Sequence, residues 1–264
     1  MRFSSGGRTL ERLAGSTPIR SRSGPAMRWR TVRTGSDPWS GATSTADQAW
    51  LRSQAGGAAR ELLQQTLLFP LARAIARPRV VGADALLHCP QPALLAANHA
   101  SDIDTPLILA ALPWGWRSRT VVGAAADRFY RNHLYAVATG LWINTFPFDR
   151  GGSLRGLASA AEFLRSGHNV LLYPQATRSS GQISGLRGGV ARLAAAMGTP
   201  IVPIHVGGSA MIMPKGRGLI QRGRATVSFG SPIFPEQSDA SELLARVQAS
   251  IAALSRNRSS ASRR

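Results

Sequence analysis

The chain has 264 residues, a length that accommodates one domain of roughly 180–200 residues with a complete hydrophobic core, plus terminal extensions. Its single cysteine, Cys89, excludes an internal disulfide and a cysteine-based metal site. The formal net charge of +19 favours an anionic partner, such as nucleic acid, an anionic membrane surface or a phosphorylated substrate. Because no nucleic-acid-binding module is recognisable and aromatic residues are few, nucleic acid is the least favoured of the three.

Residues 1–46 predict a disordered basic arm, rich in Arg, Ser, Gly and Thr. This stretch lacks the apolar core of a secretory signal peptide. Its Arg- and Ser-rich, acid-poor composition superficially resembles a transit peptide, but a disordered extension or an overextended translation start is favoured. No uninterrupted apolar run in the chain reaches the roughly 18–20 residues that a membrane-spanning helix needs.

Residues 47–78 predict an amphipathic, membrane-associating helical segment. Apolar residues from Trp50 to Ile75 cluster toward one side, and Pro70 is expected to kink the helix. One interpretation is a helix docked on the domain, and the other is an interfacial membrane helix; both can hold at once. The arginines expected to flank this apolar surface are Arg52, Arg60, Arg73, Arg77 and Arg79.

Residues 79–255 predict the main domain, in which strand patterns alternate with helix patterns. This alternation indicates an α/β fold with a mixed, largely parallel sheet flanked by helices. The basic tail, 256–264, is expected to be frayed. The predicted strands are 79–82, 93–97, 120–124, 145–148, 169–173, 201–206 and 225–229; the predicted helices are 104–112, 129–141, 153–165, 186–197 and 238–254, the last capped by Ser238.

The most informative stretch follows the apolar run 93–97, where Asn98 and His99 stand at the end of a predicted strand. If Asp104 begins a helix, the intervening turn can fold back and bring its carboxylate to the His99 imidazole. Such a pair makes a general base, because the carboxylate fixes the tautomer and stabilises the imidazolium. Asp102 is a second candidate for orienting the imidazole.

Two further polar clusters follow predicted strands and carry arginines. Arg150 lies in the cluster after 145–148, and Arg178 in the cluster after 169–173. Because sites in parallel sheets gather at the carboxyl ends of strands, these clusters are expected to share a cleft with His99. The planar guanidinium group suits phosphate binding. His99 together with Arg150 and Arg178 therefore indicates a site that deprotonates a group beside a bound phosphate.

Rival chemistries find less support. The chain has no Gly-rich phosphate loop with Lys and no Gly-x-Ser-x-Gly elbow. Its histidines are too scattered to indicate a metal site, so no metal or other bound cofactor is expected. His205 lies in an apolar strand and is interpreted as structural, and Cys89 is not expected to act as a nucleophile.

The ordered blocks resemble the glycerolipid acyltransferases typified by 1-acylglycerol-3-phosphate (lysophosphatidic acid) acyltransferase. The first block, Asn-His-x-x-x-x-Asp, is matched at 98–104, and the second, ending in Asp-Arg, at 149–150. The third, Phe-Pro-Glu-Gly-Thr-Arg-Ser, is matched by Tyr-Pro-Gln-Ala-Thr-Arg-Ser at 173–179. The fourth, an apolar strand carrying proline, is matched at 201–204. The resemblance covers about 80–229.

This resemblance implies transfer of a fatty acyl chain from acyl-CoA or acyl carrier protein to a lysophospholipid hydroxyl, without a covalent acyl-enzyme. His99 would act as the base and Asp104 would hold it. The partners would include an anionic membrane surface, with the protein peripheral or monotopic on its cytoplasmic face. The residues implied to bind substrate are Asn98, Arg150, Gln175, Thr177 and Arg178; for Asn98 and Thr177, shaping or capping a turn is the alternative.

The departures from the family pattern fall in the third block. Gln175 stands where the family has glutamate, and Ala176 replaces a glycine. These changes put the acceptor's identity in question more than the reaction. The alternatives are therefore an acyltransferase for an acceptor other than lysophosphatidic acid, and a catalytically impaired relative that binds anionic lipid.

Overall fold

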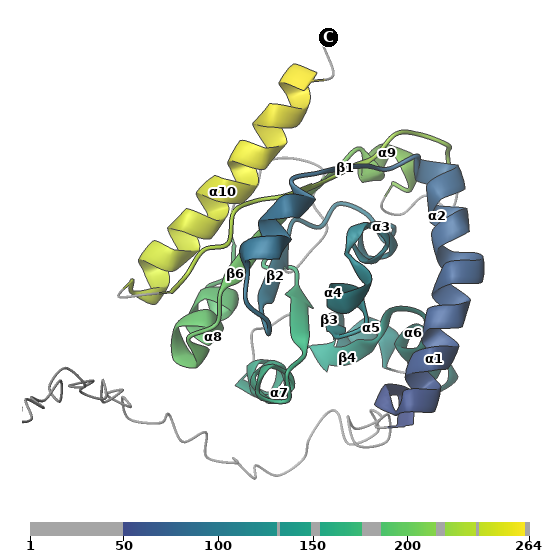
Figure 1. The fold of residues 1–264 in the computed structure, drawn as a ribbon, viewed down its shortest axis with the longest axis horizontal. Helices are drawn as coiled ribbons and strands as arrows, with labels where there is room; N and C mark the ends of the chain where they lie inside the picture. The colour runs from purple at the N-terminus through teal and green to yellow at the C-terminus, as the bar shows by residue number, and fades with distance from the viewer. Residues whose placement is uncertain are drawn as a thin grey trace, which may run out of the picture. The chain divides into compact units, whose positions relative to one another are not determined.

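The computed structural model describes residues 50–130, 133–148, 154–175, 186–214, 220–235 and 238–261. Within these ranges the strands form one sheet in the order β1-β7-β6-β2-β5-β3-β4 (Figure 1). The strands are β1 (Arg79–Val81), β2 (Leu94–Ala97), β3 (Thr120–Ala125), β4 (Thr145–Phe148), β5 (Asn169–Leu172), β6 (Ile201–Gly207) and β7 (Thr226–Phe229). Each of the seven predicted strands is present, with ends that differ by one residue at most.

The sheet is mixed and mostly parallel, which confirms the predicted fold class. The neighbours β6, β2, β5, β3 and β4 all run parallel to one another. β7 pairs with β6 in the antiparallel direction, and β1 then pairs with β7 in parallel, so β1 and β7 run against the other five strands. The carboxyl ends of the five parallel strands therefore share one edge, called here the carboxyl edge.

Helices cover both faces of the sheet. They are α1 (Gln54–Leu63), α2 (Phe69–Ala76), α3 (Asp104–Ala111), α4 (Trp114–Arg117), α5 (Ala126–Phe129), α6 (His133–Ile143), α7 (Leu154–Arg165), α8 (Gly189–Met197), α9 (Ser209–Ile212) and α10 (Ala240–Ala261). α2, α3, α4 and α9 contribute to one buried cluster with the sheet, whereas α7, α8 and α10 contribute to another. Figure 1 accordingly shows α8 and α10 on the opposite side of the strands from α1 and α2.

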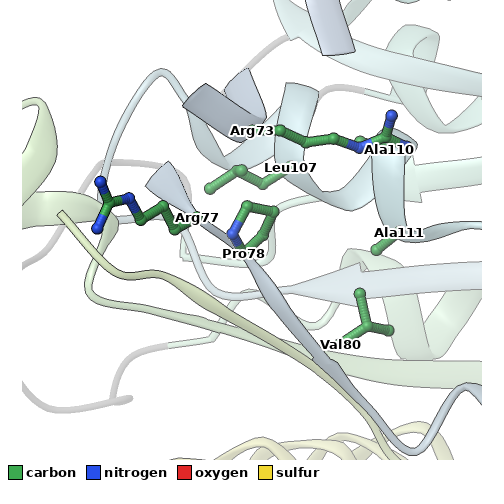
Figure 2. A pocket seen from close by; sticks show the side chains of 7 residues that line it. All are labelled: Arg73, Arg77, Pro78, Val80, Leu107, Ala110 and Ala111. Carbon is green, nitrogen blue, oxygen red and sulfur yellow. The ribbon is translucent and has the colours of Figure 1, made fainter. Parts of the chain in front are cut away.

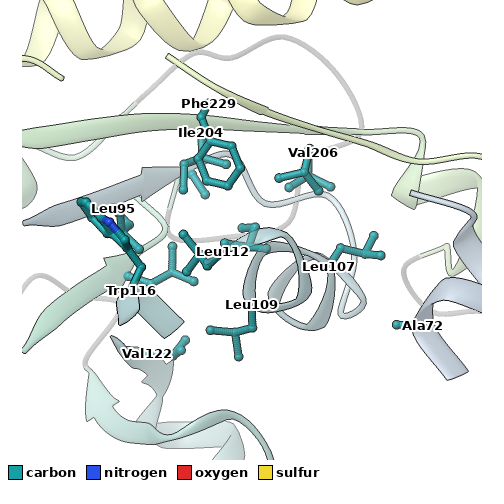
Figure 3. Packing of buried hydrophobic residues seen from close by; sticks show 14 of the residues in the cluster. Ala72, Leu95, Leu107, Leu109, Leu112, Trp116, Val122, Ile204, Val206 and Phe229 are labelled. Atoms are coloured by element: carbon teal, nitrogen blue, oxygen red, sulfur yellow. The ribbon is translucent and has the colours of Figure 1, made fainter. Parts of the chain in front are cut away.

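Strand side chains alternate between the two clusters, as the period of a β-strand requires. On β2, Leu95 belongs to the cluster under α3, whereas Leu94 belongs to the cluster under α8 and α10. Figure 3 shows Leu107 and Leu112 around α3 in the same cluster as Ile204, Val206 and Phe229 of the sheet. Burial of each such side chain stabilises the fold by about 1.5–3 kcal/mol. The fully buried β2 strand thus fixes the position of the polar segment that follows it.

The helical segment before β1 is docked on the domain, which is one of the two interpretations left open by the sequence. Phe69 and Ala76 are fully buried in the cluster under α3. Just before Pro70, where the sequence predicts a kink, a π-helical turn, η2 (Gln64–Leu68), joins α1 to α2. Pro70 has no backbone N–H to donate, and the wider hydrogen-bond spacing of the π-helical turn accommodates this missing donor.

Two of the arginines expected to flank the apolar surface of this segment donate to backbone carbonyl groups. Arg60 is buried and donates to the Leu51 carbonyl. Its pKa is lowered to about 10, mainly by burial and to a smaller extent by the positive charge of the nearby Arg52. Arg52 donates to the Thr145 carbonyl at the start of β4. The contact of Arg60 thus lies within its own segment, whereas that of Arg52 ties the segment to the sheet.

Several predicted helix boundaries also need correction. The helix expected at 129–141 is α6, which begins at His133 and ends at Ile143, and a separate short helix, α5, ends at Phe129 before it. Asp239, and not Ser238, caps α10, since its carboxylate accepts from the backbone N–H groups of Ser241 and Glu242. α10 continues to Ala261, so the residues of the predicted frayed tail up to that point are helical. The short helices α4 and α9 were not predicted.

Candidate active site

His99 and Asp104 meet as the sequence predicts. The carboxylate of Asp104, the first residue of α3, is fully buried, and its Oδ2 lies 3.0 Å from Nδ1 of His99. The same oxygen accepts the backbone N–H groups of Ala100 and Ser101 at 2.7 and 2.8 Å. The turn thus presents two backbone N–H donors to the same carboxylate oxygen that faces Nδ1 of His99.

This geometry selects one tautomer of the imidazole. Oδ2 of Asp104 accepts two backbone N–H groups, so we interpret it as the acceptor toward Nδ1 as well. A neutral imidazole held in this way carries its proton on Nδ1 and a lone pair on Nε2. The His99 side chain is 22% exposed, whereas that of Asp104 is buried completely. The pair is thus an imidazole with a buried carboxylate on one nitrogen and a basic second nitrogen, which is the arrangement of a general base.

Tyr173, directly after β5, forms the wall beside the imidazole. Its ring is stacked on that of His99 with centroids 4.3 Å apart and planes 28° from parallel. Its hydroxyl lies 2.6 Å from Oγ1 of Thr105, the residue after Asp104. Burial and the nearby charge of Asp104 raise the pKa of Tyr173 well above its usual range, so its hydroxyl stays protonated at neutral pH.

Gln175 reaches the same site from the end of β5. Its Oε1 accepts the backbone N–H of His99 at 3.1 Å. β2 and β5 are neighbouring parallel strands, so this bond joins the polar segments that follow them. A glutamate oxygen can accept the same N–H. The bond to His99 therefore explains how glutamine can stand where the resembling family has glutamate.

Asn98 uses both ends of its side-chain amide to bridge two strands. Its Nδ2 donates to the Val206 carbonyl at 2.9 Å, and its Oδ1 accepts the Val206 N–H at 2.6 Å. Asn98 is buried, so these bonds satisfy the amide in place of water. They favour the interpretation in which Asn98 shapes the turn before His99, and they leave substrate contact by this residue as a prediction.

The carboxylate that faces Nδ1 of His99 is that of Asp104, and not that of Asp102, the second option raised by the sequence. Its two carboxylate oxygens each lie 3.0 Å from a guanidinium nitrogen of Arg128. Both side chains are about one-third exposed. Arg128 belongs to α5, which follows β3 at the carboxyl edge, so the pair ties the outer side of the His99–Asp104 turn to the next loop.

The remaining predicted site residues, Arg150, Thr177 and Arg178, lie outside the described residues. The structure does describe the strands that precede them, β4 before Arg150 and β5 before Thr177 and Arg178. β4 and β5 end at the carboxyl edge together with β2. The expectation that the two guanidinium groups lie beside His99 therefore remains a prediction.

Other chemistry finds no geometric support in the part of the chain that the structure covers. Within it, no three residues among His, Cys, Asp and Glu are grouped so that they could hold a metal ion. Cys89 is buried, and its burial raises the thiol pKa to about 11. A thiol with that pKa is protonated at neutral pH, which disfavours a nucleophilic role.

A groove lies beside the second half of α3, on the face of the sheet that carries α2. Its volume is about 460 Å³, and its apolar floor is formed by Leu107, Ala110 and Ala111 together with Pro78 and Val80. Figure 2 shows Arg73 extending along this floor toward Ala110, and Arg77 on the other side of Pro78. The groove therefore combines an apolar surface with two cationic groups, about one to two helical turns beyond Asp104, the residue that holds the imidazole.

The residues that sequence reasoning missed are Tyr173, Thr105 and Arg128. Tyr173 was part of the third block, but nothing in the pattern indicated that its ring faces His99. Thr105 stands next to Asp104, and its partner is 68 positions away. Their contacts join different strands and loops, so only the assembled sheet reveals them.

Among the described residues, no helix is both long enough and apolar enough to cross a bilayer. Several large apolar side chains are nevertheless exposed. On the segment before β1 they include Leu62, Leu67 and Leu71, and near the carboxyl edge they include Leu134 of α6 and Met211 of α9.

Comparison with known proteins agrees with the resemblance to acyltransferases. A family model described as acyltransferase matches residues 77–207, a range that contains β1 to β6. A solved structure of the 1-acyl-sn-glycerophosphate (LPA) acyltransferase of Thermotoga maritima matches with a TM-score of 0.53 and 20% identity, covering 78% of this chain and 89% of that one. At this identity the match shows a shared fold.

Two curated relatives are chloroplastic 1-acyl-sn-glycerol-3-phosphate acyltransferases. The Brassica napus protein is 33% identical over 85 residues, which are 31% of this chain and 25% of that protein. The Arabidopsis thaliana protein is 25% identical over 157 residues, covering 56% of this chain and 41% of that protein. The match thus spans less than half the length of either relative. Together with the family model and the four ordered blocks, these findings show that the chain belongs to the acyltransferase family, within which it is similar to the 1-acylglycerol-3-phosphate acyltransferases.

Proposed function

We propose that the protein transfers a fatty acyl chain from an acyl-CoA or acyl carrier protein thioester to the hydroxyl of a lysophospholipid, with lysophosphatidic acid as the first candidate acceptor. The observation that carries this proposal is the His99–Asp104 pair, in which Nδ1 is held 3.0 Å from a buried carboxylate at the carboxyl edge of an acyltransferase-type sheet. The family match and the relatives named above supply the reaction class.

In the proposed mechanism, Nε2 of His99 accepts the proton of the acceptor hydroxyl while the oxygen attacks the thioester carbonyl. The tetrahedral intermediate then collapses, the C–S bond breaks, and the thiolate receives the proton that His99 carries. Asp104 stabilises the imidazolium between these two transfers. A positioned general base of this kind accelerates a reaction by about 10²–10⁴-fold.

Arg150 and Arg178 are proposed to bind phosphate groups of the acceptor or the donor, and Thr177 is proposed to assist them. The guanidinium groups of the two arginines suit bidentate contact with phosphate.

Gln175 is proposed to influence which acyl acceptor is used. Its Oε1 is engaged by His99, so any donor contact to an acceptor comes from its amide nitrogen. The amide nitrogen would favour a substrate whose contacting atom accepts a hydrogen bond. A glutamate at this position would instead favour a substrate hydroxyl that donates one.

The groove beside α3 is proposed to hold part of an acyl chain. Ala111 is seven residues beyond Asp104, about 10 Å along the helix, which is shorter than a long fatty acyl chain. A chain whose carbonyl carbon lies at His99 can therefore reach the floor formed by Leu107, Ala110 and Ala111. This floor would remove methylene groups from water, a gain of about 0.8 kcal/mol for each CH₂ buried.

The protein is also proposed to bind a membrane surface peripherally, because its substrates are lipids. Leu62, Leu67 and Leu71 are between 46% and 66% exposed on one helical segment, and the exposed Arg73 and Arg77 follow them. Apolar side chains flanked by arginines are typical of segments that lie in the headgroup region of anionic bilayers. Location on the cytoplasmic face remains a prediction of the sequence.

The test is a thiol-release assay with purified protein, palmitoyl-CoA and lysophosphatidic acid. Release that disappears in His99→Ala supports the enzyme. Lysophosphatidylcholine, lysophosphatidylglycerol and glycerol 3-phosphate, assayed in parallel, identify the acceptor. Binding to anionic vesicles with no turnover on any acceptor, from either palmitoyl-CoA or palmitoyl-acyl carrier protein, would refute the proposal in favour of an anionic-lipid-binding relative.

A further inference from the structure

We infer that Tyr173 and Thr105 form a positioning pair that fixes the orientation of the His99 imidazole for the proposed transfer. The inference rests on the proposed role of His99 as the base and adds a second support for it. The single hydrogen bond from Nδ1 to Asp104 leaves the ring able to pivot about that bond. The stacked Tyr173 ring, with its centroid 4.3 Å away, removes this freedom.

The position of the tyrosine ring is fixed in turn by Thr105. The two hydroxyl groups are 2.6 Å apart, and Thr105 is buried in the first turn of α3, next to Asp104. The imidazole is therefore held from two sides by the same helical turn. One connection runs directly through Asp104, and the other runs through Tyr173 from the end of β5.

The chemistry of this pair suits positioning and not proton transfer. The Tyr173 hydroxyl points to Thr105, so it is not aimed at the edge where Nε2 meets the substrate. A neutral hydroxyl also adds no second negative charge beside Asp104. Its contribution is to hold Nε2 in one direction, and a small displacement of a reacting group lowers a rate considerably.

The hydroxyl pair is also a feature of this particular chain. The third block of the resembling family begins with phenylalanine, which keeps a ring but lacks the hydroxyl that contacts Thr105. In Tyr173→Phe the ring remains and Thr105 loses its partner, whereas in Thr105→Val the tyrosine hydroxyl loses its partner. The two substitutions therefore remove the same bond from opposite ends.

The test is a double-mutant cycle with Tyr173→Phe and Thr105→Val, read as kcat and acceptor KM. Each single variant is expected to lower kcat about 3–10-fold without raising KM, and the double variant is expected to lose no more than the worse single variant. Tyr173→Leu, which also removes the stacked ring, is expected to lower kcat about 10–100-fold. Losses that multiply in the double variant, or that appear in KM, would overturn the pairing.

A matched control is Thr120→Val. Thr120 is buried, and its hydroxyl donates to the Trp116 carbonyl at 2.8 Å, but it lies at the start of β3, away from the carboxyl edge. This variant loses a comparable bond and is expected to keep the parent kcat.

A second readout does not depend on turnover. The ¹⁵N spectrum of histidine-labelled protein is expected to show His99 as one tautomer with a protonated Nδ1 in the parent. In Tyr173→Leu it is expected to show averaging between orientations. An unchanged His99 signal in that folded variant refutes the positioning role, even if the acceptor for the acyl transfer is still unidentified. A parent protein that shows the fixed tautomer but acylates nothing would instead contradict the proposed function.

Discussion

The backbone N–H of His99 donates to the side-chain oxygen of Gln175, 3.1 Å away, and this bond joins the segments that follow β2 and β5. The bond makes position 175 part of the support for the imidazole. A glutamate preserves the accepting oxygen and replaces the free amide group by a second oxygen, whereas an alanine removes the bond altogether.

Gln175→Glu is therefore expected to remain active but to change acceptor preference. The ratio of kcat/KM for lysophosphatidic acid to that for glycerol 3-phosphate is the measurement. Gln175→Ala, which leaves the His99 N–H without its partner, is expected to lower kcat/KM about 10-fold for all acceptors. Equal ratios in the parent and Gln175→Glu would show that this side chain does not take part in acceptor selection.

Asp104→Asn is expected to lower kcat by about 10²–10⁴-fold, because the amide does not stabilise the imidazolium. The matched control is Asp102→Asn, the same change two residues away. Asp102 contacts Arg128 in a partly exposed pair that is worth about 0–1 kcal/mol. This control is expected to stay within about 3-fold of the parent kcat. Similar losses in the two variants would mean that the Asp104 carboxylate has no special role.

Cys89 is expected to resist alkylation in the folded protein. Burial raises its pKa from 9.0 to about 11, so at pH 8 the thiolate fraction is about 100-fold lower than for an ordinary thiol. Iodoacetamide labelling followed by mass spectrometry, with and without urea, measures this difference. Equal labelling rates in the two conditions would contradict the buried position.

The same pKa shift predicts a change of stability with pH. A raised pKa means that the folded protein keeps its proton where the unfolded chain loses it, so the free energy of unfolding decreases as the pH rises from about 9 to about 11. Urea denaturation at several pH values, compared between the parent and Cys89→Ala, isolates this contribution. The variant should show a smaller decrease over that range.

Ala111→Phe is expected to fill the floor of the groove beside α3. Activity with long-chain acyl-CoA should then fall more than activity with a short-chain donor, because only the long chain reaches the floor. Ala195→Phe, at an exposed position of α8 on the other face of the sheet, is the control for the added volume. Equal losses with both donors would place the acyl chain elsewhere.

Much of the site could be predicted from the sequence because its central contact is local. His99 and Asp104 are five positions apart, and a turn followed by a helix start is enough to bring them together. The strands of the sheet were predictable for a similar reason, since each is a short apolar run whose alternation or burial shows in a few consecutive residues. The Asn98–Val206 bridge and the pairing of Asp102 with Arg128 were not predictable, because they join segments of different strands.

The amino-acid order thus decided which short segments become strands and helices and which polar residues follow each strand. Assembly of the sheet decided which of those residues meet. The order β6-β2-β5 brought Gln175 and Tyr173 to His99, and the reversal at β7 placed the last strand antiparallel. The physical reason is that local conformation depends on neighbouring residues, whereas strand pairing depends on burying apolar faces from segments that are far apart in the chain.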